Sequence, residues 1–156
     1  MLKKLLEKQA VFSATLKFLA FFAQRPAFGG FTRWATGLSA RLNVSLNKPA
    51  FAQTPAKLAE TWQALMPPDG KQYFPVTLLT EDTAYTEIHV TCPLRGTGHV
   101  AACHKLMHYD RELMRKVGGE LIVLESQSNS GKDYCRLAIR PQGKDTSDLK
   151  PAFEKD

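Results

Sequence analysis

The three cysteines, Cys92, Cys103 and Cys135, are the residues of this sequence with the clearest chemical potential. Thiolates bind soft metals and act as nucleophiles, so cysteines that meet in space form a metal site or a catalytic site. Their spacing matches no zinc-finger or Cys-x-x-Cys pattern, and spacing alone favours scattered buried cysteines. Each one, however, lies at the end of an expected strand or helix, where a rigid scaffold presents its ligands. We therefore expect the three cysteines to form one shared site.

Residues 100–117 are expected to form a long helix that begins near Cys103 and is closed by Gly118 and Gly119. At 100° per residue, one stripe of this helix faces the core, and it consists of Cys103, Met107, Asp110, Met114 and Val117. A second stripe borders it and consists of His104, His108, Arg111 and Arg115. Asp110 on the apolar stripe is either satisfied by a neighbouring donor or supports a ligand of the site.

These stripes, together with Cys92 and Cys135, supply the candidate site residues. The candidate metal ligands are Cys92, Cys103, Cys135 and His104. The candidate catalytic residues are Cys103, His104 and His108, because a cysteine nucleophile needs a base within reach. Met107 and Arg111 are candidates for binding a cofactor or ligand, since a guanidinium pairs well with a carboxylate. The alternative for the histidines and arginines is an ordinary solvated helix face.

The other expected elements indicate an α+β domain with N-terminal helices and an antiparallel sheet of about four strands. Helices are predicted over residues 2–24, 31–42 and 55–66, and strands over 72–80, 84–91, 120–125 and 134–140. This gives a helical N-terminal region (1–66), an antiparallel α+β domain for a metal or small molecule (72–140), and a tail (143–156) that we expect to be disordered. The one long helix lies between two hairpins.

Charge is distributed unevenly along the 156 residues, whose formal net charge is +6. Residues 1–48 contain eight basic residues and one acidic residue, and seven of the nine phenylalanines lie at or before Phe51. This pattern is typical of a patch that binds nucleic acid, a surface that binds a membrane, or an amphipathic helical arm. We favour a helical arm that packs on the domain or on a second copy of it. We expect no nucleic-acid partner. The odd number of cysteines and the lysine within the first apolar run favour a cytoplasmic protein over an exported one.

The run CPLRGTGHVAACHKLMHYDRELMRKVGGELIVLESQSNSGKDYCRLAI resembles the vinyl-reductase-type small-molecule-binding domain and the related 2-amino-thiazoline-4-carboxylate hydrolase-like family. The shared pattern is a Cys-Pro after a strand, a cysteine that opens a helix, a glycine pair before a strand ending in Glu, and a Gly-x-x-x-Cys turn. The resemblance covers residues 72–140 and implies a pocket for a small molecule, with Cys92, Cys103 and Cys135 as metal ligands near its mouth. Family members carry a further cysteine where this chain has Ser126 and Gln127. The fourth ligand would then be a histidine, Glu125, a water or a substrate, or the site holds no metal.

Two functions follow as hypotheses. The first is a small-molecule-binding or sensing domain with a cysteine-ligated metal, either zinc or an iron–sulfur cluster. The second is a hydrolase of small thiazoline-like heterocycles that uses the Cys/His site. The expected partners are a small-molecule ligand, a second copy in a homodimer, and a membrane surface that contacts the basic N-terminal helices.

Overall fold

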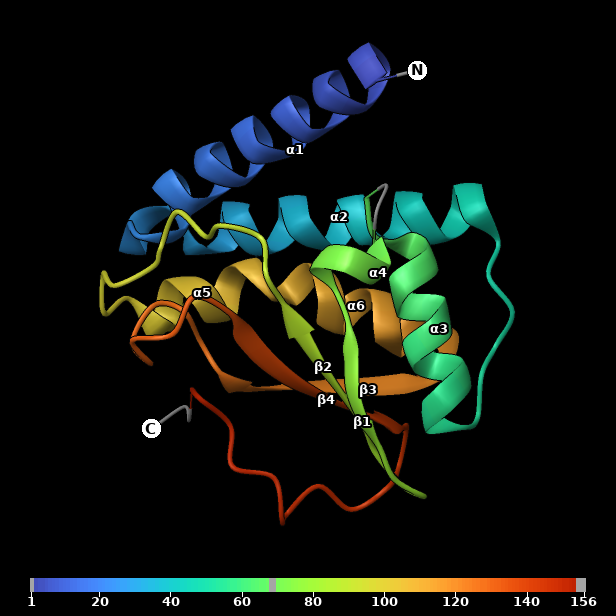
Figure 1. The fold of residues 1–156 in the computed structure, drawn as a ribbon. Helices are drawn as coiled ribbons and strands as arrows, with labels where there is room; N and C mark the ends of the chain where they lie inside the picture. The colour runs from blue at the N-terminus through green and yellow to red at the C-terminus, as the bar shows by residue number, and fades with distance from the viewer. Residues whose placement is uncertain (1, 68–69, 154–156) are drawn as a thin grey trace.

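The computed structural model describes residues 2–67 and 70–153 and contains the expected combination of helices and an antiparallel sheet (Figure 1). Its elements are α1 (Leu2–Ala23), η1 (Pro26–Phe28), α2 (Gly29–Asn47), α3 (Pro55–Leu65), α4 (Gly70–Tyr73), β1 (Val76–Leu79), β2 (Ala84–Ile88), α5 (Val100–Leu106), α6 (His108–Val117), β3 (Gly119–Glu125) and β4 (Cys135–Pro141). The α+β prediction is confirmed.

The sheet has four strands in the order β1-β2-β4-β3, and all neighbouring strands are antiparallel. The two sequence-local hairpins, β1–β2 and β3–β4, are joined through the pairing of β2 with β4. In that pairing Ile88 lies opposite Cys135, so the end of β2 and the start of β4 are adjacent. Cys92 follows β2 by four residues, and the sheet therefore brings Cys92 and Cys135 towards the same end.

The helices differ from the prediction in three places. α2 runs from Gly29 to Asn47, so it is longer at both ends than the helix expected over 31–42. Residues 70–73 form α4, which includes the first two residues of the strand expected over 72–80, and that strand begins only at Val76. The helix expected over 100–117 is interrupted at Met107, which ends α5 and precedes α6.

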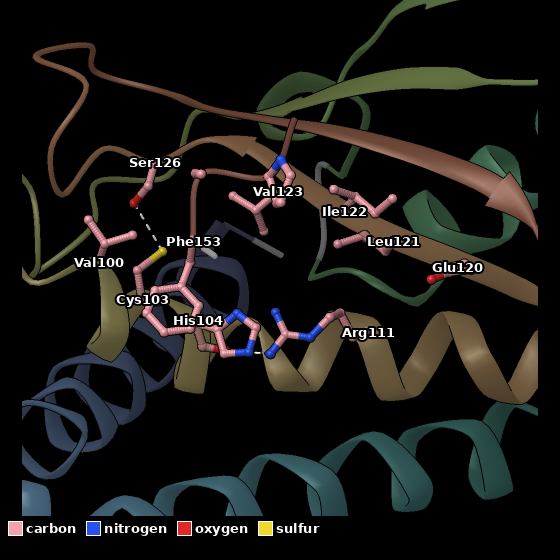
Figure 2. Close-up of a pocket in the computed structure, with 12 residues that line it drawn as sticks. Val100, Cys103, His104, Arg111, Glu120, Leu121, Ile122, Val123, Ser126 and Phe153 are labelled. Atoms are coloured by element: carbon pink, nitrogen blue, oxygen red, sulfur yellow. Dashed lines mark hydrogen bonds between the residues drawn. The ribbon is translucent and has the colours of Figure 1, made fainter. Parts of the chain in front are cut away.

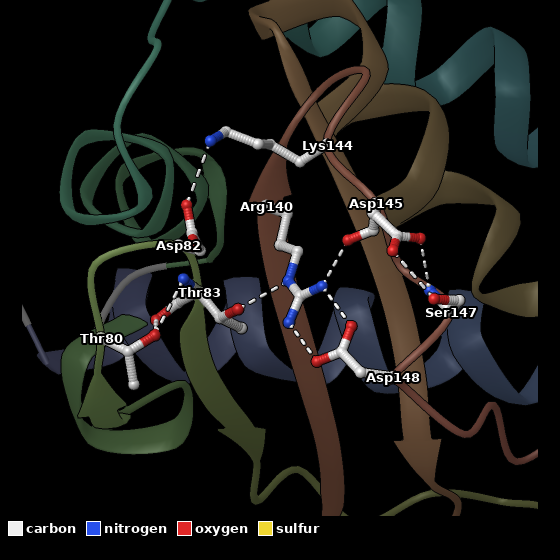
Figure 3. Close-up of polar contacts among 8 residues, drawn as sticks. All are labelled: Thr80, Asp82, Thr83, Arg140, Lys144, Asp145, Ser147 and Asp148. Atoms are coloured by element: carbon white, nitrogen blue, oxygen red, sulfur yellow. Dashed lines mark hydrogen bonds and ion pairs between the residues drawn. The ribbon is translucent and has the colours of Figure 1, made fainter.

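The C-terminal segment differs from the expected disordered tail over residues 143–153, whereas residues 154–156 lie outside the described part. The backbone N–H of Ala152 donates to the carbonyl of Val123, so the segment runs along β3, an edge strand of the sheet. Its anchor is the Arg140 guanidinium, which donates to both carboxylate oxygens of Asp148 at 2.6 and 2.7 Å and to Thr83 Oγ1 at 2.6 Å (Figure 3). The charged composition of this segment suggested disorder. In the structure, part of that charge, the Asp148 carboxylate, pairs with Arg140.

Candidate functional site

A cavity of about 520 Å³ lies between the helices and one end of the sheet, and we call it the large cavity. Its lining comes from α1, α2, the end of α3, the segment after β2, and both α5 and α6. The apolar part of the lining consists of Phe12, Leu16, Leu19, Leu65, Met66, Phe74, Ile88, Val90, Leu106 and Met107. Polar side chains are fewer, and they include Asn43, Tyr109, Asp110 and Gln127.

All three cysteines line this large cavity, as free thiols. Cys103 and Cys135 are buried, and each thiol shifts the pKa of the other. Cys92 is half-buried; the charge of Cys103 raises its pKa, and its own charge raises the pKa of Cys135. The structure thus places the three cysteines in one cluster at the wall of one cavity.

Cys103 is the acidic thiol of the cluster. The Cys135 thiol donates to it, and together with the hydroxyl of Ser126 and the positive charge of Arg111 it lowers the pKa of Cys103 to about 7, although burial acts in the opposite direction. The pKa of Cys135 is raised for the complementary reason, because its proton is held in the bond to Cys103. Burial raises the pKa of Cys92. Cys103 is therefore the thiol that ionises first.

The segment after β3 holds the cysteines in place through Ser126 and Gln127. Ser126 Oγ donates to Cys103 Sγ at 3.0 Å, and the backbone N–H of Gln127 donates to Cys135 Sγ at 3.4 Å. The Gln127 side chain accepts from the backbone N–H of Cys92 at 3.3 Å and donates to the carbonyl of Val90 at 2.9 Å. These two residues occupy the positions where the resembled family carries a further cysteine, and here they supply hydrogen bonds to all three cysteine residues.

Cys103 also borders a second cavity of about 170 Å³, which we call the small cavity (Figure 2). It lies between α5, α6 and β3, and the C-terminal segment covers part of it with Phe153. The rings of Phe153 and His104 are 4.6 Å apart between centroids, and Arg111 donates to the backbone carbonyl of His104. The small cavity therefore gathers Cys103, His104 and Arg111, three of the predicted site residues.

Met107 and His108 lie elsewhere. Met107 lines the large cavity, whereas Arg111 lines the small one, so the two predicted ligand-binding residues do not contact the same space. His108 faces α2, where its ring nitrogen lies 3.2 Å from the position of a Cβ added to Gly37. Burial, reinforced by Arg33, lowers the pKa of His108. His108 lines neither of the two cavities that Cys103 borders, so the structure does not bring it together with Cys103 and His104.

The donors around the cysteines bear on the predicted metal site. Among the residues that the structure describes, no group of three or more His, Cys, Asp and Glu side chains is arranged to hold a metal ion. His104 turns towards Phe153, and Glu125 pairs with Lys132 at 2.6 Å. Besides Cys135, the side chain next to Cys103 is Ser126, whose hydroxyl is a poor ligand for zinc. A metal on the three cysteines therefore stays a prediction.

Sequence reasoning left Asp110 with two alternatives, and the structure provides it with a donor. Trp62 Nε1 donates to Asp110 Oδ1 at 3.0 Å, and burial raises the pKa of this carboxyl to about 6. Two contributors were not predicted, namely α1 as a wall of the large cavity and Asn43, which donates to the Tyr109 hydroxyl at 2.6 Å. Ser126 and Gln127 were noted only as replacing a cysteine, and their hydrogen bonds to the cysteines were not predicted. The apolar face of α1 was the one available signal.

Comparison of the chain with protein-family models, with curated proteins and with solved structures returns no match. The family resemblance described above stays a prediction, and the functional argument rests on the geometry of the two cavities.

Proposed function

We propose that this domain binds a small, largely apolar molecule in the large cavity and acts as a ligand-binding or sensing module. The observation that carries the proposal is the size and lining of that cavity. Ligand pockets typically measure about 300–1,000 Å³ and are lined mainly by apolar side chains, whereas ordinary protein cores leave few voids larger than a water molecule. At about 520 Å³, the large cavity has the size of a ligand pocket.

The polar groups of the wall restrict what the ligand can be. Asp110, Asn43 and the Tyr109 hydroxyl supply hydrogen-bonding atoms to the wall of the cavity, and the three thiols supply weak ones. A molecule with several charges would lose its hydration against the apolar remainder of the wall, at a cost that these few groups do not offset. A mostly apolar molecule with one polar end fits this distribution best.

The test is binding of N-phenyl-1-naphthylamine, a neutral fluorophore whose emission rises in apolar surroundings. We expect saturable binding at one site, and we expect Val90→Trp, which fills the cavity, to weaken it about tenfold or more, a loss of about 1.4 kcal/mol. Val76→Trp is the matched control, because Val76 is exposed on β1 and lines neither cavity. Equal affinities for the two variants, or no saturable binding by folded protein, would refute the proposal.

A hydrolase of small heterocyclic carboxylates is the second candidate, and the small cavity favours it. Cys103 has a lowered pKa, Arg111 is a partner for a carboxylate, and His104 lies on the same cavity wall. Its volume of about 170 Å³ is below the usual range for ligand pockets, so we rank this function second. Incubation with 2-amino-thiazoline-4-carboxylate distinguishes the two: turnover that is lost in Cys103→Ser and kept in Cys92→Ser supports the hydrolase.

Zinc or an iron–sulfur cluster on Cys92, Cys103 and Cys135 stays a separate prediction. Metal analysis and a visible absorption spectrum of protein purified without air decide it. A stoichiometric metal that is lost in Cys135→Ser would support the metal site. Metal-free protein that keeps its stability would refute it.

A further inference from the structure

α1 and α2 meet at one corner of the molecule, where η1 joins them (Figure 1), and exposed aromatic side chains from these three elements gather there. We call this group the aromatic patch, and it consists of Phe18, Phe21, Phe22, Phe28, Phe31 and Trp34. Phe22 lies at its centre, with ring centroids 4.8–5.4 Å from those of Phe18, Phe21, Phe28 and Phe31, and the ring of Trp34 follows that of Phe31 at 6.2 Å. The rings therefore form one continuous surface.

The patch is open to solvent. Trp34 is 63% exposed, Phe18 55% and Phe21 52%. Along α2 the exposed apolar stripe continues through Leu38, Leu42 and Leu46, on the side opposite the buried face that contains Thr36 and Ala40. A contiguous apolar surface of this kind marks an interaction site in a water-soluble domain.

Positive charge surrounds the patch, and negative charge is absent from the sequence around it. Residues 8–59 contain seven lysines and arginines and no aspartate or glutamate. The Arg25 guanidinium lies 3.4 Å from the centroid of the Phe21 ring, inside the patch itself. Among the described residues, Lys17, Arg25 and Arg33 take part in no ion pair, whereas Arg41 is paired with Glu112 at 3.3 Å.

We propose that the aromatic patch docks on the surface of an anionic lipid bilayer. Aromatic rings favour the headgroup level of a bilayer, and neighbouring lysines and arginines are attracted to anionic lipids. An anionic bilayer therefore suits both the rings of the patch and the cations beside it. A second copy of the chain fits less well, because a two-fold interface places the same cations opposite each other. Across residues 2–67 and 70–153, no helix combines the length and apolar character needed to cross a bilayer, and the contact is therefore one of lying on the surface.

The chain contains two tryptophans, and they report on this contact directly. Trp62 is fully buried against Phe74, whereas Trp34 lies in the patch. Titration of the full chain with vesicles of phosphatidylcholine and phosphatidylglycerol should shift the Trp34 emission to shorter wavelength, and added salt should reverse the shift. Vesicles of phosphatidylcholine alone should bind much more weakly.

Two sets of variants separate the aromatic and the electrostatic contributions. Phe21→Ser with Trp34→Ser should abolish vesicle flotation, whereas Leu78→Ser with Leu79→Ser, an equally exposed pair on β1, should leave it unchanged. Arg25→Gln with Arg33→Gln should weaken binding to anionic vesicles about 25-fold, about fivefold for each cation.

Several results would overturn the proposal: no binding to anionic vesicles, equal binding to neutral ones, or equal loss in the β1 control pair. A dimer that dissociates in Trp34→Ser, without any vesicle binding, would also overturn it and assign the patch to a second copy.

Discussion

Replacement of Asp110 by asparagine tests how far the large cavity is shielded from water. Asp110 is 8% exposed, lies on α6 and faces the cavity, and Trp62 Nε1 donates to it at 3.0 Å. Burial raises the pKa of this carboxyl from 3.8 to about 6, and the bond from Trp62 and the charge of Arg111 limit the rise. Asparagine keeps the acceptor for Trp62 and removes the titration.

The sign of the pH effect follows from the raised pKa. Between pH 4 and pH 6 the folded chain holds a proton that the unfolded chain has released, so Asp110 lowers the stability progressively as pH rises through this window. The difference between 3.8 and about 6 corresponds to about 3 kcal/mol, which is fully present above pH 6. Asp110→Asn should therefore match the wild type near pH 3 and exceed its stability by about 3 kcal/mol at pH 7.

Urea unfolding followed by circular dichroism at pH 3, 4, 5, 6 and 7 measures this difference. Asp82→Asn is the control, because Asp82 is exposed and paired with Lys144 at 3.2 Å, and it should show no gain at pH 7. A stability difference that does not change with pH would refute the reasoning, since it would mean that water in the cavity solvates the Asp110 carboxylate.

Three further predictions concern the scaffold and the thiols. Gly118→Ala should lower the free energy of unfolding by about 3 kcal/mol, because its φ is +95° and the new Cβ would lie 2.7 Å from a backbone oxygen. Gly96→Ala is the control: its φ is +68° and no atom lies within 4 Å of the new Cβ, so the free energy of unfolding should fall by only about 1 kcal/mol. Urea unfolding measures both values. Ser126→Ala should raise the pKa of Cys103 by less than about one pH unit, measured by the pH profile of iodoacetamide labelling at that residue; an unchanged profile would contradict the role of the hydroxyl. Arg140→Ala should destabilise the protein by about 2 kcal/mol and expose residues 143–153 to proteolysis, and unchanged protease resistance would show that the ion pair does not hold the segment.

Most of the secondary structure was predictable from local signals. The Thr54-Pro55 pair starts α3, and the Thr54 hydroxyl accepts from the backbone N–H of Lys57 as an N-cap does. Gly118 ends α6 in the left-handed conformation, as a glycine at that position indicates. Stretches rich in β-branched, aromatic and other apolar residues located three of the four strands to within a few residues, and Pro75 explains why β1 begins late.

The site was only partly predictable. The positions of Cys92, Cys103 and Cys135 at element ends predicted one shared site, and the three residues line the same cavity in the structure. Whether they act together stays a prediction. The arrangement of the histidines depended on a continuous helix, and the interruption at Met107 places His104 and His108 on different sides. The periodicity of the sequence does not signal such an interruption. In the structure α5 packs against α1 and α2, whereas α6 packs against α2, α3 and β3. The large cavity was also beyond local reasoning, since its walls come from segments distant in sequence.

α1 has consequences for how a ligand would exchange. One face of this helix, with Phe12, Leu16 and Leu19, lines the large cavity, and another carries Phe18 and Phe21 of the aromatic patch. Transfer of an apolar molecule into water costs about 0.8 kcal/mol for each CH₂ group. If the patch rests on a bilayer, displacement of α1 would open a path from the acyl chains to the cavity that bypasses this hydration step. The exchange rate would then depend on the motion of one helix and not on the aqueous solubility of the ligand.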